Sequence, residues 1–82
     1  MYTILFSATA DKQFGKLEKP VQERIIRSLE RLRINPSPHV TKLVGEIGYR
    51  LRVGDYRVIL DILNDRLIVL VIKIGHRSTI YQ

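Results

Sequence analysis

Residues 49–77 read Y-R-L-R-V-G-D-Y-R-V-I-L-D-I-L-N-D-R-L-I-V-L-V-I-K-I-G-H-R, and this stretch decides the fold of the chain. Two turn signals, Gly54-Asp55 and Asn64-Asp65, divide it into three short runs rich in Val, Ile, Leu and Tyr. Such runs separated by short polar turns are typical of consecutive β-hairpins. The stretch therefore predicts a three-stranded antiparallel meander, against which the rest of the chain packs.

A two-residue turn at Gly54-Asp55 fixes the pairing in the first predicted hairpin. Counting outward from the turn, Arg52 lies opposite Arg57, and Arg50 lies opposite Ile59. Side chains alternate between the two faces of a sheet, so the three arginines share one face and the intervening apolar side chains share the other. Like charges directly opposite each other destabilise a sheet. The arginine face is therefore predicted to bind an anion.

The second predicted hairpin brings more polar residues to the same end of the sheet. A two-residue turn at Asn64-Asp65 places Arg57 opposite Ile72, so the third strand ends beside the arginines, where Gly75 interrupts it. His76, Arg77 and Tyr81 follow at that end. The predicted anion site consists of Arg50, Arg52, Arg57 and Arg77, with the imidazole of His76 and the phenol of Tyr81 nearby.

Length and charge set limits on the class of protein. The 82 residues suit one domain, residues 1–82, and the net charge of +6 favours polyanionic partners. Nine of the fourteen basic residues are arginine, which suits two-pronged phosphate contacts. The chain has no cysteine, its apolar start is too short for a signal peptide, and no run reaches membrane-spanning length. We expect a soluble cytoplasmic protein without a membrane partner.

The first half of the chain predicts one strand and two helices. The strand covers residues 2–7, and a helix follows from Ala8 to Leu17, with Ser7 or Thr9 able to cap it. The second helix begins near Pro20 and ends before Asn35-Pro36. The order β-α-α-β-β-β predicts an α+β fold, in which a helical hairpin packs on one face of a small, mainly antiparallel sheet.

The second helix carries a row of arginines on the face opposite its apolar stripe. Arg27 has Glu23 four residues before it and Glu30 three residues after it, and Glu30 in turn has Arg33 three residues after it. These are spacings at which ion pairs form on a helix. Charged residues opposite an apolar stripe are ordinary for a surface helix. The row Arg24, Arg27 and Arg31 is therefore predicted to be a solvated helix face.

The residue types suit phosphodiester chemistry without a metal or another cofactor. The sequence has no metal-ligand spacing, nucleophilic triad or glycine-rich phosphate loop. RNA can be cut by its own 2′-hydroxyl, so a protein need only position the strand, stabilise charge on the phosphate and move two protons. Arginine is a poor base, which leaves His76 and Tyr81 as proton carriers. His39 is expected to be an exposed loop residue.

The arginine face also carries apolar side chains. Ile59, Leu70 and Ile72 fall on it by the same alternation, and this is more apolar surface than a solvated face needs. We expect a partner segment, a helix or a strand with acidic side chains, to cover them.

Three segments of the chain together resemble the RelE/ParE superfamily of type II toxin–antitoxin toxins, closer to its RelE branch. They are the run Y-R-L-R-V-G-D-Y-R-V-I, the strand L-I-V-L-V-I-K-I and the closing G-H-R-S-T-I-Y. The resemblance implies an mRNA endonuclease that works on the ribosome, leaves a 2′,3′-cyclic phosphate and inhibits translation. It also implies a protein antitoxin as partner. Two alternatives stay open: a ParE-like inhibitor of DNA gyrase and an inactive antitoxin-binding module.

The resemblance also implies roles for individual residues. Arg57 matches the arginine that stabilises the phosphate, Arg77 the proposed acid or leaving-group stabiliser, and Tyr81 the tyrosine that stacks on a base. Arg52 stands where the best-known RelE pattern has a lysine proposed as general base. The residues expected to bind RNA are Arg50, Lys42 and Lys73, and those expected to bind the antitoxin are Ile59, Leu70 and Ile72.

Overall fold

The structure is a computed structural model that describes residues 1–79. The elements in chain order are β1 (Thr3–Phe6), α1 (Ala8–Gly15), α2 (Lys19–Leu32), the 3-10 turn η1 (Ser37–His39), β2 (Thr41–Lys42), β3 (Tyr49–Val53), β4 (Tyr56–Leu63) and β5 (Ile68–His76). The predicted α+β order is confirmed, with β2 added as a two-residue strand.

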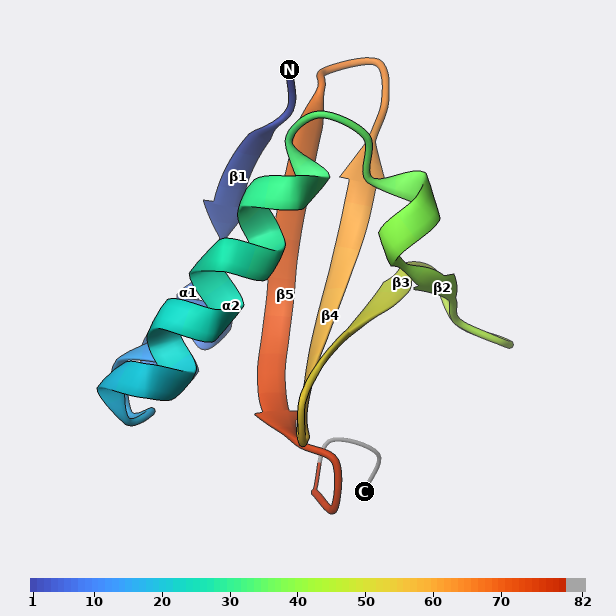
Figure 1. Cartoon of the computed structure of the whole chain (residues 1–82). Helices are drawn as coiled ribbons and strands as arrows, with labels where there is room; N and C mark the ends of the chain where they lie inside the picture. The colour runs from blue at the N-terminus through green and yellow to red at the C-terminus, as the bar shows by residue number, and fades with distance from the viewer. Residues whose placement is uncertain (80–82) are drawn as a thin grey trace.

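The strands form one mixed sheet in the order β1-β5-β4-β3-β2, shown in Figure 1. The chain enters at β1, crosses over through the two helices and η1, and returns at the far edge with β2. β1 pairs with β5 in parallel, and the other three pairings are antiparallel. The meander of residues 49–77 therefore supplies the three central strands, as expected.

Both helices lie on one side of the sheet. Ser7 caps α1, because its Oγ accepts a hydrogen bond from the amide of Ala10 at 3.0 Å. α1 ends at Gly15, earlier than the predicted Leu17, since glycine is a poor helix former. α2 has Pro20 in its first turn, as predicted. No helix within residues 1–79 is long and apolar enough to cross a membrane.

A single apolar core joins the helices to the sheet. Ile25, Leu29 and Leu32 of α2 are at most 2% exposed and face the sheet. The sheet contributes the alternate residues of its central strands, as the two-residue period of strand side chains requires. These residues are Leu51, Val53, Val58, Leu60, Val69, Val71 and Ile74. No helix within residues 1–79 packs on the arginine side of the sheet (Figure 1).

The first hairpin has the predicted register. Val53 pairs with Tyr56, and Arg52 pairs with Arg57, across a two-residue turn. Gly54 has a φ of +59° and Asp55 does not have a positive φ. This is the pattern of a type II′ turn, in which glycine occupies the first central position.

The predicted register of the second hairpin is wrong, for two reasons. Its turn spans residues 64–67, two residues more than predicted, and Leu67 adopts a φ of +53°. In addition, the register shifts between Ile59 and Leu60, where Ile72 and Lys73 together oppose Ile59. Arg57 therefore pairs with Gly75 and not with Ile72. The strand still ends beside the arginines.

α1 covers the edge of β5 that β1 does not reach. β1 pairs with β5 only as far as Val71. Beyond that point the Ser7 hydroxyl donates to the carbonyl of Ile72 at 2.6 Å, and the amide of Ile74 donates to Oε1 of Gln13 at 2.6 Å. These side chains satisfy backbone groups that an exposed edge would leave unpaired.

Candidate functional site

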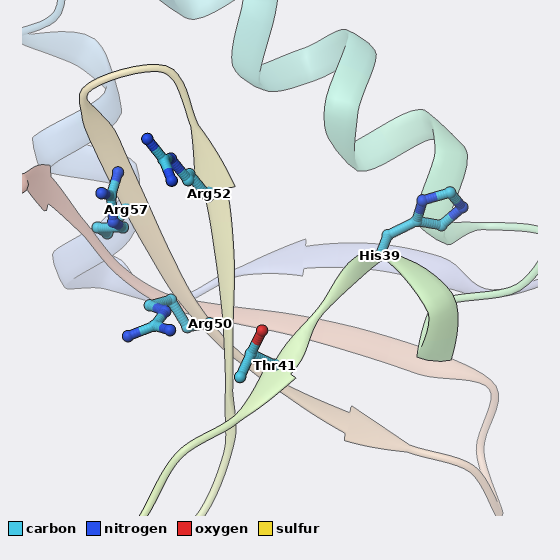
Figure 2. Close-up of a pocket in the computed structure, with 5 residues that line it drawn as sticks. All are labelled: His39, Thr41, Arg50, Arg52 and Arg57. Carbon is cyan, nitrogen blue, oxygen red and sulfur yellow. The ribbon is translucent and has the colours of Figure 1, made fainter.

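The three arginines of the first hairpin line one open pocket on the uncovered face of the sheet. Its volume is about 390 Å³, and its lining residues are His39, Thr41, Arg50, Arg52 and Arg57. Figure 2 shows that these side chains come from η1, β2, β3 and β4. The predicted sharing of one face by the arginines is thus observed. We call this pocket the arginine pocket.

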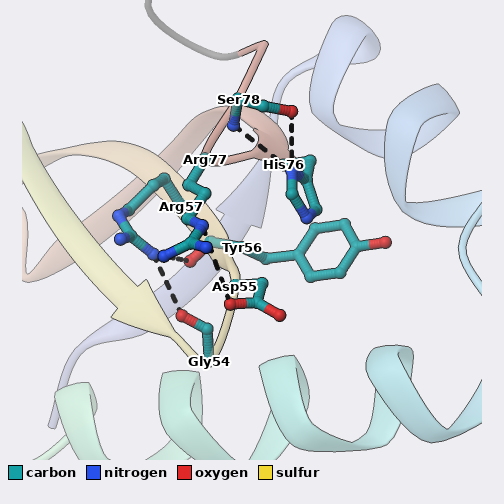
Figure 3. Close-up of polar contacts among 7 residues, drawn as sticks. All are labelled: Gly54, Asp55, Tyr56, Arg57, His76, Arg77 and Ser78. Carbon is teal, nitrogen blue, oxygen red and sulfur yellow. Dashed lines mark hydrogen bonds and ion pairs between the residues drawn. The ribbon is translucent and has the colours of Figure 1, made fainter.

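The guanidinium of Arg57 is oriented by its own turn. Its Nη1 donates to the carbonyls of Gly54 and Tyr56, each at 3.0 Å. Within residues 1–79 the other nitrogens of this guanidinium make no hydrogen bond or ion pair. One amino group thus fixes the position of the side chain and the remaining donors stay available for a ligand (Figure 3).

Arg77 is anchored on the same turn. Its amide donates to the carbonyl of Asp55 at 2.8 Å, and its Nε lies 3.8 Å from the Asp55 carboxylate. Both side chains of this ion pair are mostly exposed, at 61% and 68%, so the pair adds little stability. Arg57 and Arg77 therefore attach to consecutive residues of one turn, which agrees with their predicted proximity.

His76 lies on the other face of the sheet from the arginine pocket. It pairs with Tyr56, and the two rings make an edge-to-face contact with centroids 5.5 Å apart. Tyr56 in turn pairs with Val53, a core residue. Figure 3 shows both rings extending away from the arginine guanidinium groups. The Nδ1 of His76 accepts a hydrogen bond from the Ser78 amide at 3.2 Å.

The histidine that lines the arginine pocket is His39, which the sequence predicted to be an exposed loop residue. Figure 2 shows its ring pointing away from the three arginine side chains. It is exposed, but β2 pairs with β3 and brings the loop before it to the arginines. A two-residue strand has too weak a sequence pattern to be found by periodicity. Tyr81, the other predicted proton carrier, lies outside the described residues.

The two lysines predicted to bind RNA lie on different faces. Lys73 opposes Ile59, which places it on the arginine face two strands from β3. Lys42 pairs with Tyr49, on the opposite face, whereas its neighbour Thr41 pairs with Arg50 and lines the arginine pocket. The structure thus groups Thr41 and not Lys42 with the arginines.

The apolar residues predicted to bind a partner are unequally accessible. Ile59 is only 5% exposed, although it does not belong to the main core. Leu70 and Ile72 are partly exposed. The apolar surface on this face therefore consists mainly of β5 side chains, next to concentrated positive charge.

Chemically, the arginine pocket suits a phosphodiester. Guanidinium groups make paired hydrogen bonds to phosphate oxygens and keep their charge at all relevant pH values. Fixed cations stabilise the charge that develops on a phosphate during transfer. Within residues 1–79 no three His, Cys, Asp or Glu side chains gather as metal ligands.

The fold and the site together define a small, basic α+β protein with an arginine pocket suited to a polyanion. Residues 4–81 match the family described as the ParE toxin of the type II toxin–antitoxin system parDE. The chain belongs to this family of the RelE/ParE superfamily.

Curated relatives and solved structures agree with this assignment. The mRNA interferase toxin RelE of Escherichia coli K12 is 28% identical over 86 residues, covering 99% of this chain and 90% of the relative. The isolated E. coli RelE toxin superposes with a TM-score of 0.84 at 27% identity, covering 99% of this chain and 92% of that one. The E. coli RelBE toxin–antitoxin complex gives a TM-score of 0.79 at 27% identity, with coverages of 93% and 96%.

Proposed function

We propose that the chain is the toxin of a toxin–antitoxin pair and inhibits translation in the cytoplasm by cutting mRNA on the ribosome. The arginine pocket carries the proposal, because three guanidinium groups gather on the open face of the sheet. Relatives named mRNA interferase, which match nearly the whole chain, support the choice of RNA as substrate.

The proposed cleavage uses the 2′-hydroxyl of the RNA as nucleophile. The 2′-oxygen forms a bond to the adjacent phosphorus while the bond from phosphorus to the 5′-oxygen breaks. The products are a 2′,3′-cyclic phosphate and a 5′-hydroxyl end. One proton leaves the 2′-hydroxyl and one reaches the 5′-oxygen, so no metal or further reactant is needed.

We assign a role in this reaction to each residue according to its position. Arg57, held by the turn carbonyls, stabilises charge on the non-bridging phosphate oxygens. Arg50 and Arg52 hold the strand, and Arg77 stands beside the leaving oxygen. An imidazole exchanges the protons, and His39 is better placed for this than His76 because it lines the arginine pocket. Lys73 extends the RNA-binding surface, and we assign base stacking to Tyr81.

A cognate antitoxin is the proposed protein partner. Solved RelE–RelB complexes of related toxins support it. On this chain the partly exposed Leu70 and Ile72 lie beside the arginine face, so a segment that covers them also brings its acidic side chains to the guanidinium groups. Ile59 would contribute little, because it is already buried.

Inhibition of DNA gyrase is the second candidate, since the matching family is described by the parDE system. The test compares cleavage of mRNA on programmed ribosomes with inhibition of gyrase supercoiling, using the wild-type chain. Cleavage without gyrase inhibition is expected. Gyrase inhibition without cleavage would overturn the nuclease proposal, and inactivity in both assays would favour an antitoxin-binding module.

A further inference from the structure

A second basic pocket lies between α2 and the β3–β4 turn. Its volume is about 260 Å³, and its lining residues are Arg24, Arg27, Ser28, Arg31, Arg52, Val53 and Gly54. Four of these seven residues are arginines, and one of them, Arg52, also lines the arginine pocket. We call this second pocket the helix groove. The two pockets are thus neighbours that share one guanidinium side chain.

Contact between the turn and α2 brings these arginines together. A Cβ on Gly54 would lie 2.7 Å from Nη2 and 3.1 Å from Nη1 of Arg24. The guanidinium of Arg24 therefore lies directly over the turn. The arginine row of the helix faces the hairpin here as well as the solvent.

Within the described part of the chain, no acidic side chain neutralises the arginines of the helix groove. Of the ion pairs predicted along α2, the one between Glu30 and Arg33 forms, at 3.0 Å. Within residues 1–79 Arg27 pairs with neither Glu23 nor Glu30. Arg24, Arg31 and Arg52 likewise have no acidic partner in this part of the chain. Four converging cations without counter-charge favour the binding of an anion.

We propose that the helix groove binds the phosphate backbone of the same RNA strand that occupies the arginine pocket. Arg52, common to both pockets, makes the positive surface continuous from the cleavage site to α2. This inference rests on the proposed function, because it assumes the same RNA substrate. It extends the contact surface from the hairpin to the helix and assigns Arg27 and Arg31 to substrate binding.

The lining of the helix groove favours RNA over an acidic peptide. Among residues 1–79, the only apolar side chain that lines it is that of Val53, which is 6% exposed and belongs to the core. A peptide gains affinity from apolar anchors in pockets, and this groove offers none. Guanidinium groups with a hydroxyl from Ser28 match phosphate oxygens instead.

The test measures binding of a 12-nucleotide single-stranded RNA with 2′-O-methyl groups, which the proposed reaction cannot cut. Fluorescence anisotropy over a series of salt concentrations compares the wild type with the double variant Arg27→Gln/Arg31→Gln. The matched control is Arg33→Gln/Arg66→Gln, which removes the same charge outside both pockets. Arg24 is left unchanged because it packs on Gly54. Thermal melts confirm that each variant is folded.

The groove variant is expected to bind on the order of tenfold more weakly than the control variant. Its plot of log affinity against log salt concentration should be less steep, by roughly 0.7 for each phosphate that the variant no longer neutralises. Equal affinities and slopes for the two variants would overturn the inference, even if mRNA cleavage is observed. Binding of a poly-glutamate peptide but not of RNA would also overturn it. Groove-dependent RNA binding without cleavage would support the inference and count against the proposed nuclease alone.

Discussion

Arg52 lies directly opposite Arg57 across the β3–β4 ladder. A cross-strand pair of like charges costs up to about 1 kcal/mol. The carbonyls of Gly54 and Tyr56 offset part of this cost for Arg57, but Arg52 has no such partner within residues 1–79. The sheet therefore holds two cations together at the expense of its own stability, and an anion bound between them would relieve the repulsion.

Replacing Arg52 by Gln should stabilise the free protein. The expected gain in the free energy of unfolding is several tenths of a kcal/mol and at most about 1 kcal/mol, since one like-charge pair disappears. Urea denaturation at low and high salt measures it, and the gain should shrink at high salt as screening weakens the repulsion. Arg50→Gln is the matched control, because Arg50 pairs with Ile59. A loss of stability in Arg52→Gln would contradict the expectation.

Arg57→Ala should lower the rate of mRNA cleavage about 10²- to 10³-fold, the usual cost of removing one fixed donor from a developing negative charge. Arg77→Ala should have a comparable effect if it stabilises the leaving oxygen. Single-turnover cleavage on programmed ribosomes measures both. Arg66→Ala, in the turn at the other end of the sheet, serves as control. Full activity of Arg57→Ala would place the chemistry elsewhere.

Substitution of the two histidines, His39 and His76, should affect the cleavage rate to different extents. His39→Gln should reduce the cleavage rate about 10²-fold or more if His39 is the general acid–base, because such a group contributes about that much and His39 is a lining residue of the arginine pocket. His76→Gln should have a small effect, since its ring lies against Tyr56 on the other face. The reverse order of effects, measured in the same assay, would restore His76 to the role that the sequence suggested.

Two glycines of the loop between β2 and β3 should differ in tolerance. A Cβ on Gly48 would lie 2.9 Å from the carbonyl oxygen of Leu60, and Gly48 has a φ of +119°. Gly48→Ala should therefore destabilise the protein by more than the roughly 1 to 3 kcal/mol of backbone strain alone. Gly45→Ala meets open space and should cost only about 1 kcal/mol. Thermal unfolding of the two variants would show no difference if the close approach to Leu60 did not matter.

Local turn chemistry explains why the first hairpin was predictable and the second was not. Gly54 alone fixes a two-residue turn, and from it the positions of Arg50, Arg52 and Arg57 follow by counting. The turn after Leu63 instead depends on a leucine with positive φ, which no propensity suggests. This longer turn still leaves the side chains on their predicted faces, because it adds an even number of residues. The face on which His76 lies was missed because Ile72 is an additional residue in β5, which shifts the alternation of the strand beyond it.

The other residues that line the arginine pocket could not be predicted from the sequence for a different reason. His39 and Thr41 reach the site through a two-residue strand, whose residues pair with residues seven and nine positions further along the chain. The helix groove was missed because it depends on the approach of α2 to Gly54 in three dimensions. Periodicity within the helix showed an arginine row but not what lies beside it.

Ile72 has no partner of its own in the β4–β5 ladder, so a chain of this fold could lack this residue. Val71 and Ile74 both face the core, and Lys73 between them opposes Ile59, so the additional residue is Ile72. Without Ile72, the side chains along β5 would alternate regularly between the two faces of the sheet. Every other side chain of β5 would stay on the face that it now occupies. The hydrogen bond from Ser7 to the carbonyl of Ile72 would disappear. Homologous chains could therefore gain or lose one residue at this point while keeping the arginines where they are.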